Sequence, residues 1–240
     1  MKSLSKILVL TVCFSFAAAF CAYAEEVKPQ ETAVAAPEAA TAPAAVSEAV
    51  SVAPAAVPAP VEKTTLDNLQ AAFDGESNAN ARYLAFAKKA DEEGYGKVAS
   101  LFRAAARAEQ VHFERHAKVI KALGGVPTAK IETPDVKNTA ENLEAAMKGE
   151  IYESTVMYPE FLAQAEKDDN QDAVDSFEDA EKAEAIHAGL YKEALADLPA
   201  WKRKNKDFYV CPFCGNVVER TNFRFCPICG EMKQKFLEVK

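Results

Sequence analysis

Two short motifs of glutamate and histidine contain the residue types that bind transition metals. They are Glu109-Gln-Val-His112 and Glu184-Ala-Ile-His187, in a chain of 240 residues that has only 3 histidines. On an α-helix, residues i and i+3 share a face, so each motif directs one carboxylate and one imidazole to the same point. Two such helices supply two carboxylates and two ring nitrogens, which indicates a carboxylate-bridged dinuclear metal site.

Further glutamates complete the ligand set that such a site needs from two other helices. Each motif follows a Gly-Glu pair about one helix earlier, which offers Glu76 and Glu150. Glu153 lies three residues after Glu150 and shares its helical face. A single helical glutamate is usually solvated, but several unpaired carboxylates in one interior would each cost several kcal/mol. Metal cations are the natural compensation for Glu76, Glu109, Glu150, Glu153 and Glu184.

The metal motifs belong to an internal repeat. Residues 68–76 (NLQAAFDGE) match residues 142–150 (NLEAAMKGE) at an offset of 74, and the Glu-x-x-His motifs match at an offset of 75. The pattern predicts a duplicated helical hairpin with a pseudo-two-fold axis between the metals. Glu153 breaks this symmetry because its counterpart is Ala79, so one metal has a spare carboxylate.

Residues 64–200 predict an all-α four-helix bundle. This region is rich in Ala, Glu, Lys and Leu, with apolar residues at helical spacing. We expect helices over residues 66–93, 97–123, from after Pro134 to 167 with a bend near Pro159, and 171–198. Residues 124–135 form a connection longer than the hairpin turns, as a crossover between two hairpins requires.

Three other side chains are expected near the dinuclear site. His116 follows His112 by one turn without a matching carboxylate, which favours a supporting or surface position over metal binding. Tyr83 and Tyr158 are predicted core aromatics. Each either brings its hydroxyl near the metals or serves packing alone.

The amino-terminal residues predict export. Lys2 and Lys6 precede an uncharged run that closes with Ala-Tyr-Ala, which is typical of a signal peptide over residues 1–24. An uncleaved membrane anchor is the alternative, since the run reaches the lower length limit of a membrane span. Residues 25–63 are dominated by Ala, Pro, Val and Glu and predict a disordered spacer. The expected location is periplasmic or otherwise exported.

The charge balance argues against nucleic acid as a partner. The formal net charge is −8, and the chain has no basic cluster that could follow a phosphate backbone. Acidic side chains therefore have to be explained by metal binding or by ordinary solvation.

Residues 207–240 contain a second predicted metal site. Cys211-Pro-Phe-Cys214 and Cys226-Pro-Ile-Cys229 form a paired C-x-x-C motif that suits tetrahedral zinc or iron. A segment this short needs a bound metal or another cross-link in order to fold. Disulfides are the alternative in an exported protein, but two such knuckles fit a metal better. Six aromatic residues are expected to form either an apolar shell that would tune a redox iron or simply the only core of this module: Phe208, Tyr209, Phe213, Phe223, Phe225 and Phe236.

From about Thr64 to Lys240 the chain resembles the rubrerythrin family, which joins a ferritin-like di-iron bundle to a small carboxy-terminal rubredoxin-like domain. The resemblance rests on Gly75-Glu76-Ser77, Arg82-Tyr83, both Glu-x-x-His motifs, Gly149-Glu150-x-x-Glu153, Met157-Tyr158-Pro159 and the paired cysteines. It implies two iron ions held by Glu76, Glu109, His112, Glu150, Glu153, Glu184 and His187. It also implies one iron held by Cys211, Cys214, Cys226 and Cys229, where zinc is the alternative.

The resemblance further implies a peroxidase that reduces hydrogen peroxide to water in protection against oxidative stress. The di-iron site would be re-reduced by electrons passed through the cysteine-bound iron. One iron would exchange Glu153 for His112 on reduction, and Tyr83 or Tyr158 would orient peroxide. The family also implies a homodimer, paired head to tail.

Export alters what this resemblance implies about partners, because reduced pyridine nucleotides are confined to the cytoplasm. We therefore expect a redox protein as the electron donor. The alternative function is iron handling, by a ferroxidase or storage-type bundle with a structural zinc ribbon. A metal-binding adaptor without enzymatic activity is a third interpretation, and it requires redox-inert zinc in both sites.

Overall fold

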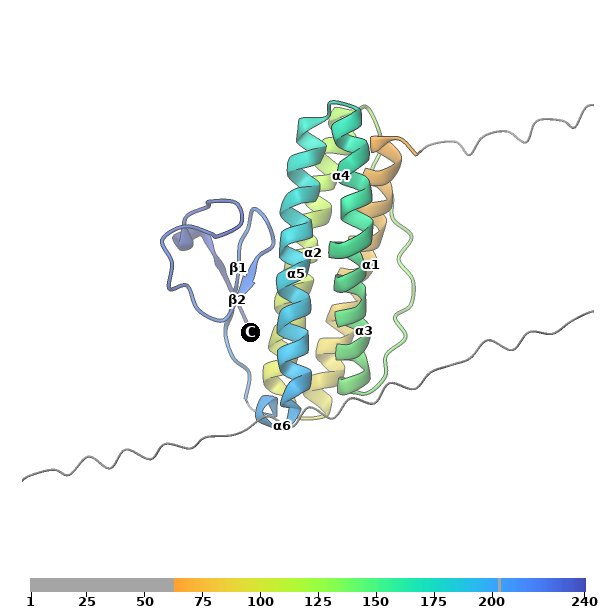
Figure 1. Ribbon diagram of the computed structural model, residues 1–240. Coiled ribbons are helices and arrows are strands. Elements are labelled where there is room, and N and C mark those ends of the chain that lie inside the picture. The colour runs from red at the N-terminus through yellow and green to blue at the C-terminus, as the bar shows by residue number, and fades with distance from the viewer. Residues whose placement is uncertain (1–62, 203) are drawn as a thin grey trace, which may run out of the picture. The chain divides into compact units, whose positions relative to one another are not determined.

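The computed structural model describes residues 63–202 and 204–240. The predicted signal peptide and nearly all of the predicted spacer lie outside these residues. The described chain forms an elongated helical bundle followed by a small β-domain (Figure 1). Within the described residues, no helix is long and apolar enough to cross a membrane. The bundle helices are α1 (Thr65–Glu92), α2 (Gly96–Ala122), α3 (Thr139–Tyr152), α4 (Tyr158–Lys167) and α5 (Gln171–Ala196).

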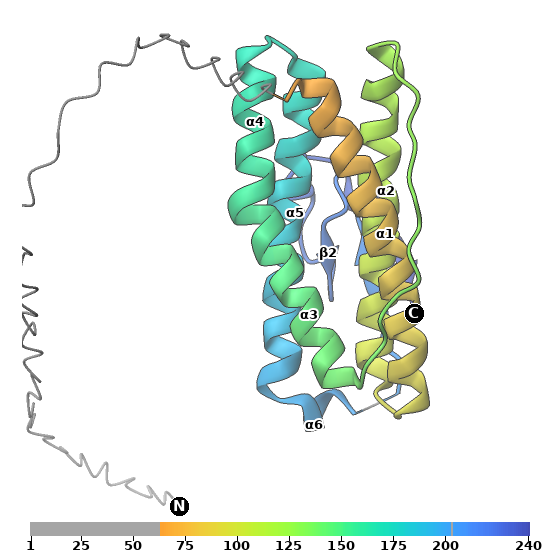
Figure 2. The same ribbon diagram turned by 90° about the vertical axis from the view of Figure 1, so that its right-hand side faces the viewer.

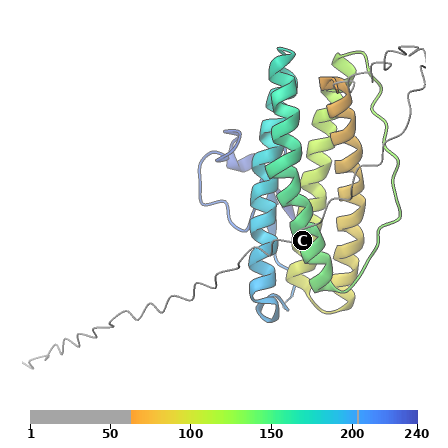
Figure 3. The same cartoon turned by 45° about the vertical axis from the view of Figure 1, so that its right-hand side comes forward.

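Helix α3 and helix α4 together form the third rod of a four-helix bundle (Figure 3). The third helix begins at Thr139, later than the predicted start after Pro134, because Asn138 caps it by accepting a hydrogen bond from the Glu141 backbone N–H at 3.0 Å. The fourth ends at Ala196, two residues earlier than predicted. Asp197 then caps a separate short helix, α6 (Leu198–Trp201).

The predicted bend near Pro159 is instead a π-helical segment, η1 (Glu153–Met157), between α3 and α4. Its wider turn is closed by the Tyr158 backbone N–H, which donates to the Glu153 carbonyl five residues earlier. Such a segment accommodates one extra residue without turning the helix away from its partners. Pro159 lies in the first turn of α4, where a missing N–H costs little.

The extra residue explains why the repeat offset changes from 74 to 75. In the first half Glu76 and Tyr83 are seven residues apart, which is about two turns of α-helix, so both face the interior. In the second half Glu150 and Tyr158 are eight residues apart, and the π-helical segment absorbs the additional residue. Both of these residues are fully buried. The insertion therefore leaves the two-fold relation of the inward side chains intact.

The crossover from α2 to α3 runs along the outside of the bundle beside α1 (Figure 2). Three polar side chains spaced one turn apart on α1 hold its backbone: Gln70, Asp74 and Asn78. Asp74 accepts from the Lys130 N–H at 2.7 Å, and Asn78 accepts from the Glu132 N–H at 2.9 Å. The predicted long connection is confirmed, and these contacts fix its path.

The apolar core consists of two clusters with the polar metal motifs between them. One cluster surrounds Tyr83, Phe86 and Phe102, and the other surrounds Leu69, Ile120 and Phe177. On each helix, the glutamates and histidines of the predicted site lie between residues of the two clusters. Burying each large apolar side chain contributes roughly 1.5–3 kcal/mol. The two clusters thereby hold the four helices together on both sides of the polar metal motifs, whose burial is energetically costly.

The β-domain is a three-stranded antiparallel sheet of β1 (Phe208–Val210), β2 (Val217–Val218) and β3 (Leu237–Val239), in the order β2-β1-β3. Phe208 and Val210 of β1 are fully buried and belong to the same apolar cluster as Trp201 of α6. The rings of Phe208 and Trp201 stack with centroids 6.4 Å apart. The sheet is therefore attached to the bundle through a shared core.

Candidate metal centres

Six of the predicted di-iron ligands gather in the bundle interior as two overlapping groups. The first group is Glu76, Glu109, His112 and Glu184, and the second is Glu109, Glu150, Glu184 and His187. Within each group, one ligand atom per residue lies within 4.8 Å of all the others, and all six side chains are at most 2% exposed. Glu109 and Glu184 belong to both groups, as expected of carboxylates that bridge two metals.

Several buried polar atoms in this cluster lack hydrogen-bond partners. They are Glu76 Oε2, Glu109 Oε1, Glu150 Oε2, both carboxylate oxygens of Glu184, and His187 Nδ1. The Glu184 oxygens lie 2.8 Å from His112 Nδ1 and 2.7 Å from His187 Nδ1, but they are not aligned as hydrogen bonds. Lone pairs that converge in this way, deep in an apolar core, fit a pair of divalent cations. The donor set of carboxylates and imidazoles suits iron.

The acid–base properties of the cluster without metal also indicate a cation site. Burial raises the pKa of Glu76, Glu109 and Glu150, and nearby carboxylates raise it further. Burial acts in the same direction on Glu184, but its two adjacent imidazoles outweigh it and lower the pKa. Without a cation, these three carboxyl groups therefore keep their protons to higher pH than a free glutamate would. Metal binding would displace them.

Hydrogen bonds to the cysteine domain hold the two histidine rings in place. The Nε2 atom of His112 lies 3.0 Å from the Cys214 carbonyl oxygen, and that of His187 lies 3.1 Å from the Gly215 carbonyl oxygen. A carbonyl only accepts, so each Nε2 carries a proton. Each Nδ1 faces the glutamates, and that of His112 lies 2.9 Å from Glu109 Oε2. Burial lowers the pKa of both rings, but the neighbouring carboxylates outweigh it and raise the pKa, so a metal would displace the Nδ1 proton when it binds there.

Two tyrosines bind the single glutamates reciprocally across the repeat. The Tyr83 hydroxyl, from the first half, donates to Glu150 Oε1 of the second half at 2.7 Å. The Tyr158 hydroxyl, from the second half, donates to Glu76 Oε1 of the first. Both tyrosines are fully buried. They thus have hydroxyls at the centre, which excludes a purely packing role.

Glu153, the predicted seventh ligand, belongs to neither group of converging atoms. It opens the π-helical segment and is only partly buried. Burial, together with the charges of Glu184 and Glu109, raises its pKa to about 7. Its role as a ligand stays a prediction, but the carboxylate lies close enough to sense the bridging pair.

His116 lies in the second layer around the centre, and the surface position considered for it is wrong. The ring is 0% exposed. Its Nδ1 lies 2.9 Å from the Ser176 hydroxyl, and its Nε2 lies 3.1 Å from the Tyr158 hydroxyl. Both nitrogens are therefore engaged by neutral hydroxyls, and a chain of hydrogen bonds connects His116 to Glu76 through Tyr158.

The four cysteines of the β-domain form the second centre. The sulfur atoms of Cys211 and Cys229 are 3.6 Å apart, as are those of Cys214 and Cys226. A disulfide requires about 2.05 Å, so the disulfide alternative is excluded for these thiols. Tetrahedral coordination with metal–sulfur bonds of about 2.3 Å separates sulfurs by roughly 3.8 Å. The observed spacing is close to that of a four-thiolate metal site.

The expected aromatic shell of the knuckles is largely wrong. Phe213 and Phe225 are 48% and 49% exposed, and Phe208 packs against the bundle instead. Phe236 is the one of the six aromatic residues that packs in the apolar cluster of the cysteines, beside Ile228. The positions of these rings depend on how the sheet packs against α2 and α6. The spacing of residues in the sequence does not reveal this packing.

Sequence reasoning missed two polar residues near the centres. Arg115 pairs with Asp179 and also donates to the Phe213 carbonyl at 3.0 Å. Ser176 binds His116. Arg115 is three residues after His112 and Ser176 is eight before Glu184, so helical spacing alone would have placed both near the metal motifs.

A helical bundle with two bridging glutamates and two Glu-x-x-His motifs defines a ferritin-like, carboxylate-bridged dinuclear protein, here joined to a four-cysteine domain. The rubrerythrin family model matches residues 67–195. The chain belongs to the rubrerythrin family. The carboxylate–histidine cluster is the di-iron site of this family, and the four cysteines form its rubredoxin-like iron site.

Relatives and solved structures agree with this assignment. Nigerythrin from Nitratidesulfovibrio vulgaris is 39% identical over 161 residues, which cover 67% of this chain and 79% of that protein. Rubrerythrin-2 from Clostridium acetobutylicum is 35% identical over 178 residues, covering 72% and 95% of the two chains. The fully reduced, all-ferrous structure of nigerythrin aligns with a TM-score of 0.69 at 36% identity, covering 79% of this chain and 91% of that one. A Desulfovibrio desulfuricans bacterioferritin, at 24% identity and a TM-score of 0.53, shares the fold.

Proposed function

We propose that the protein is a peroxidase whose di-iron site reduces hydrogen peroxide to water and is re-reduced through the cysteine-bound iron. The observation that supports it most is a run of three successive carbonyls in the first cysteine knuckle. Those of Phe213, Cys214 and Gly215 accept hydrogen bonds from Arg115, His112 and His187, at 3.0, 3.0 and 3.1 Å. A structural zinc ribbon that served docking alone would not need its knuckle bonded to both metal-binding histidines.

The contact offers a short electron path between the two metal sites. Cys214 contributes its thiolate to one site, and its own carbonyl is bonded to the imidazole of His112 at the other. One residue, one hydrogen bond and one aromatic ring therefore join the two ligand sets. The expected head-to-tail pairing would make such a contact between two chains, whereas here it lies within one chain. The homodimer remains a prediction.

The reaction needs two electrons and two protons for each peroxide. Bound iron would supply Lewis acidity and electrons. Glu109, Glu184 and the Nδ1 atoms of both histidines would hold the metals, and burial of these ligands excludes water. The hydroxyls of Tyr83 and Tyr158 hold Glu150 and Glu76 in place and would orient a peroxide.

Gly215 provides a direct test, because the close approach of the two domains depends on it. Its φ is +76°, and a Cβ there would lie 2.2 Å from His112 Nε2. In Gly215→Ala the knuckle has to move away from His112. We expect both metal sites to stay loaded, while electron transfer from the reduced cysteine-bound iron to the oxidised di-iron site slows by about tenfold or more in stopped-flow absorbance.

Gly230 offers a matched control in the second knuckle. It has the same φ of +76°, but a Cβ there would meet nothing within 4 Å. Gly230→Ala therefore imposes the same backbone strain without the clash, and its electron transfer should resemble that of the unchanged protein. Equal rates in Gly215→Ala and the unchanged protein would contradict the proposed path.

We further propose that the protein is exported and receives electrons from a redox protein. This rests on the signal-like residues 1–24, which lie outside the described residues. Fractionation of cells that produce the full chain, with amino-terminal sequencing of the product, tests it. A mature chain that begins near Glu25 outside the cytoplasm supports export, and an intact chain in the cytoplasm contradicts it.

A further inference from the structure

His116 takes part in a buried hydrogen-bond chain that metal binding does not require. The chain connects Ser176, His116, Tyr158 and Glu76 in that order. All four residues are at most 3% exposed. One end is a ligand-type carboxylate of the di-iron site, and the other end is a serine of α5.

The hydrogen-bond donors along this chain all point in one direction. The Tyr158 hydroxyl donates its hydrogen bond to Glu76 Oε1. The Tyr158 oxygen then accepts from His116, whose proton must be on Nε2. Burial, aided by the charges of His112 and Arg115, lowers the pKa of His116 to about 3, so the ring is neutral. Its Nδ1 therefore accepts from the Ser176 hydroxyl.

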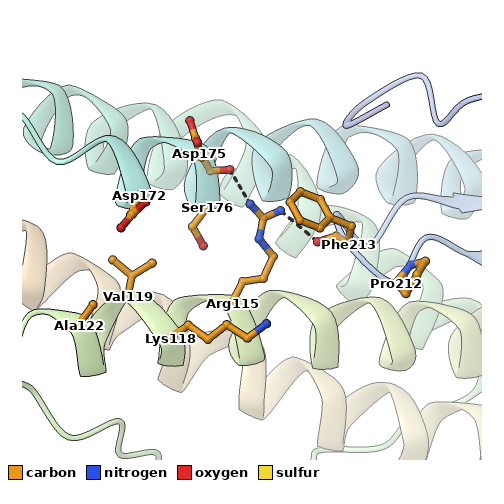
Figure 4. A pocket seen from close by; sticks show the side chains of 9 residues that line it. All are labelled: Arg115, Lys118, Val119, Ala122, Asp172, Asp175, Ser176, Pro212 and Phe213. Carbon is orange, nitrogen blue, oxygen red and sulfur yellow. Dashed lines mark hydrogen bonds between the residues drawn. The ribbon is translucent and has the colours of Figure 1, made fainter. Parts of the chain in front are cut away.

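Ser176 is also part of the lining of a surface pocket of about 450 Å³ between α2, α5 and the first cysteine knuckle. Polar groups surround it, among them Arg115, Lys118, Asp172 and Asp175. Figure 4 shows Ser176 extending from α5 toward α2 beside the Arg115 guanidinium. The buried chain therefore begins at the lining of a pocket that opens to the surface.

The repeat-related positions on the other side of the metal site form no equivalent path. At the offset of 75, His116 corresponds to Tyr191 and Ser176 to Leu101. The Tyr191 hydroxyl has no hydrogen-bond partner among the described residues. Its ring packs against Tyr83 and Phe102 in the apolar cluster that also includes Leu101. Packing alone would be served by either arrangement, so the polar chain, which takes two residues from each half, requires a different explanation.

We propose that Ser176, His116 and Tyr158 conduct protons from this pocket to Glu76 at the di-iron site. The proposal rests on the proposed peroxidase function, in which H₂O₂, two protons and two electrons from reduced iron give two water molecules. As the O–O bond breaks, Tyr158 passes its proton to the Glu76 carboxylate, which passes it on to a product oxygen. Tyr158 then takes a proton from His116 Nε2. His116 Nδ1 takes one from Ser176, and Ser176 takes one from solvent in the pocket.

His116 and Ser176 act through Tyr158, so their test includes a readout that does not depend on turnover. The full chain, labelled with ¹⁵N-histidine and loaded with diamagnetic zinc, would be studied by NMR. We expect His116 to be neutral with its proton on Nε2, and this proton to exchange with water about tenfold more slowly in Ser176→Ala. A proton on Nδ1, or unchanged exchange in Ser176→Ala, would overturn the chain.

The second arm measures oxidation of the reduced iron-loaded protein by peroxide in H₂O and in D₂O. We expect Ser176→Ala and His116→Gln to slow this step by about 10- to 100-fold and to increase its solvent isotope effect, with partial rescue by a small buffer acid. Tyr191→Phe, the equivalent change in the other half, should leave the rate and the isotope effect unchanged. Normal rates in both chain variants would refute proton conduction.

The two arms separate this proposal from the peroxidase proposal. If the unchanged protein does not reduce peroxide, the proposed function fails, and the NMR exchange alone decides whether the pocket delivers protons to the site. If the unchanged protein reduces peroxide and the chain variants match it, proton conduction fails and the peroxidase stands.

Discussion

The two halves of the bundle bind metal in the same way but differ in the layer around it. Each half gives one single glutamate, one Glu-x-x-His motif and one tyrosine that holds the glutamate of the other half. Outside this shared set, Glu153 of the second half corresponds to Ala79 of the first. The π-helical segment of the second half corresponds to regular α-helix in the first. His116 in a polar chain likewise corresponds to Tyr191 in an apolar cluster.

The difference separates two requirements of the centre. Holding two cations needs equivalent donors on both sides, which duplication provides. In the proposed peroxidase, one side would supply protons and the other would change its ligands, which requires the halves to diverge. The asymmetric residues are therefore the ones expected to alter activity without altering metal content.

Removing a bridging carboxylate should have the largest effect, and it should be equal in the two halves. Glu109→Ala and Glu184→Ala each delete a ligand common to both groups. We expect both variants to lose the two bundle irons and keep the cysteine-bound iron, as measured by metal analysis. Glu178→Ala, on the exposed face of α5, is the control and should bind iron normally. Loss of one bundle iron in only one variant would contradict the shared bridge.

Replacing Glu153 tests the asymmetry directly. Glu153→Ala makes the second half resemble the first, where Ala79 stands. Since Glu153 lies outside both groups of converging atoms, we expect iron content to be retained. Peroxide turnover should fall by about tenfold or more, which corresponds to an activation free energy that is higher by at least about 1.4 kcal/mol. Unchanged turnover would exclude a ligand exchange at this carboxylate.

The metal-free protein should lose stability as pH rises. The pKa of Glu153 is raised from 4.5 to about 7 in the folded chain, so between these values the folded state binds more protons than the unfolded state. The free energy of unfolding then falls through this window, by an amount of order 1 kcal/mol or more. Denaturation of the metal-free chain from pH 4.5 to 7 measures it. Metal binding should reverse the trend, because it favours ionised carboxylates.

Deleting one residue of the π-helical segment should have the smallest effect on stability. Removal of the exposed Thr155 converts the segment to regular α-helix and restores the offset of 74. Glu150 and Tyr158 then become seven residues apart, as in the first half, so we expect folding and iron content to be kept. Peroxide turnover should change, because Glu153 is moved relative to the centre. A chain that no longer folds would show that the extra residue is structural.

Much of the metal centre could be predicted from sequence, because helical spacing alone determines which residues share a face. Glu109, His112, Glu184 and His187 needed only this rule and the internal repeat. The π-helical segment was visible only as a shift of the offset from 74 to 75, which spacing cannot distinguish from an insertion in a loop. The surroundings of His116 and Phe213 depend on contacts between distant segments, and no local pattern records them.

In the function proposed above, the two iron sites act together as one peroxidase. The most direct test reduces the full chain anaerobically, adds stoichiometric hydrogen peroxide and follows the visible thiolate-to-iron absorption of the cysteine site. We predict that reduction bleaches this absorption and that peroxide restores it rapidly in the unchanged protein but slowly in Gly215→Ala. An absorption that stays bleached while peroxide persists, or a colourless site that holds zinc, would contradict the account.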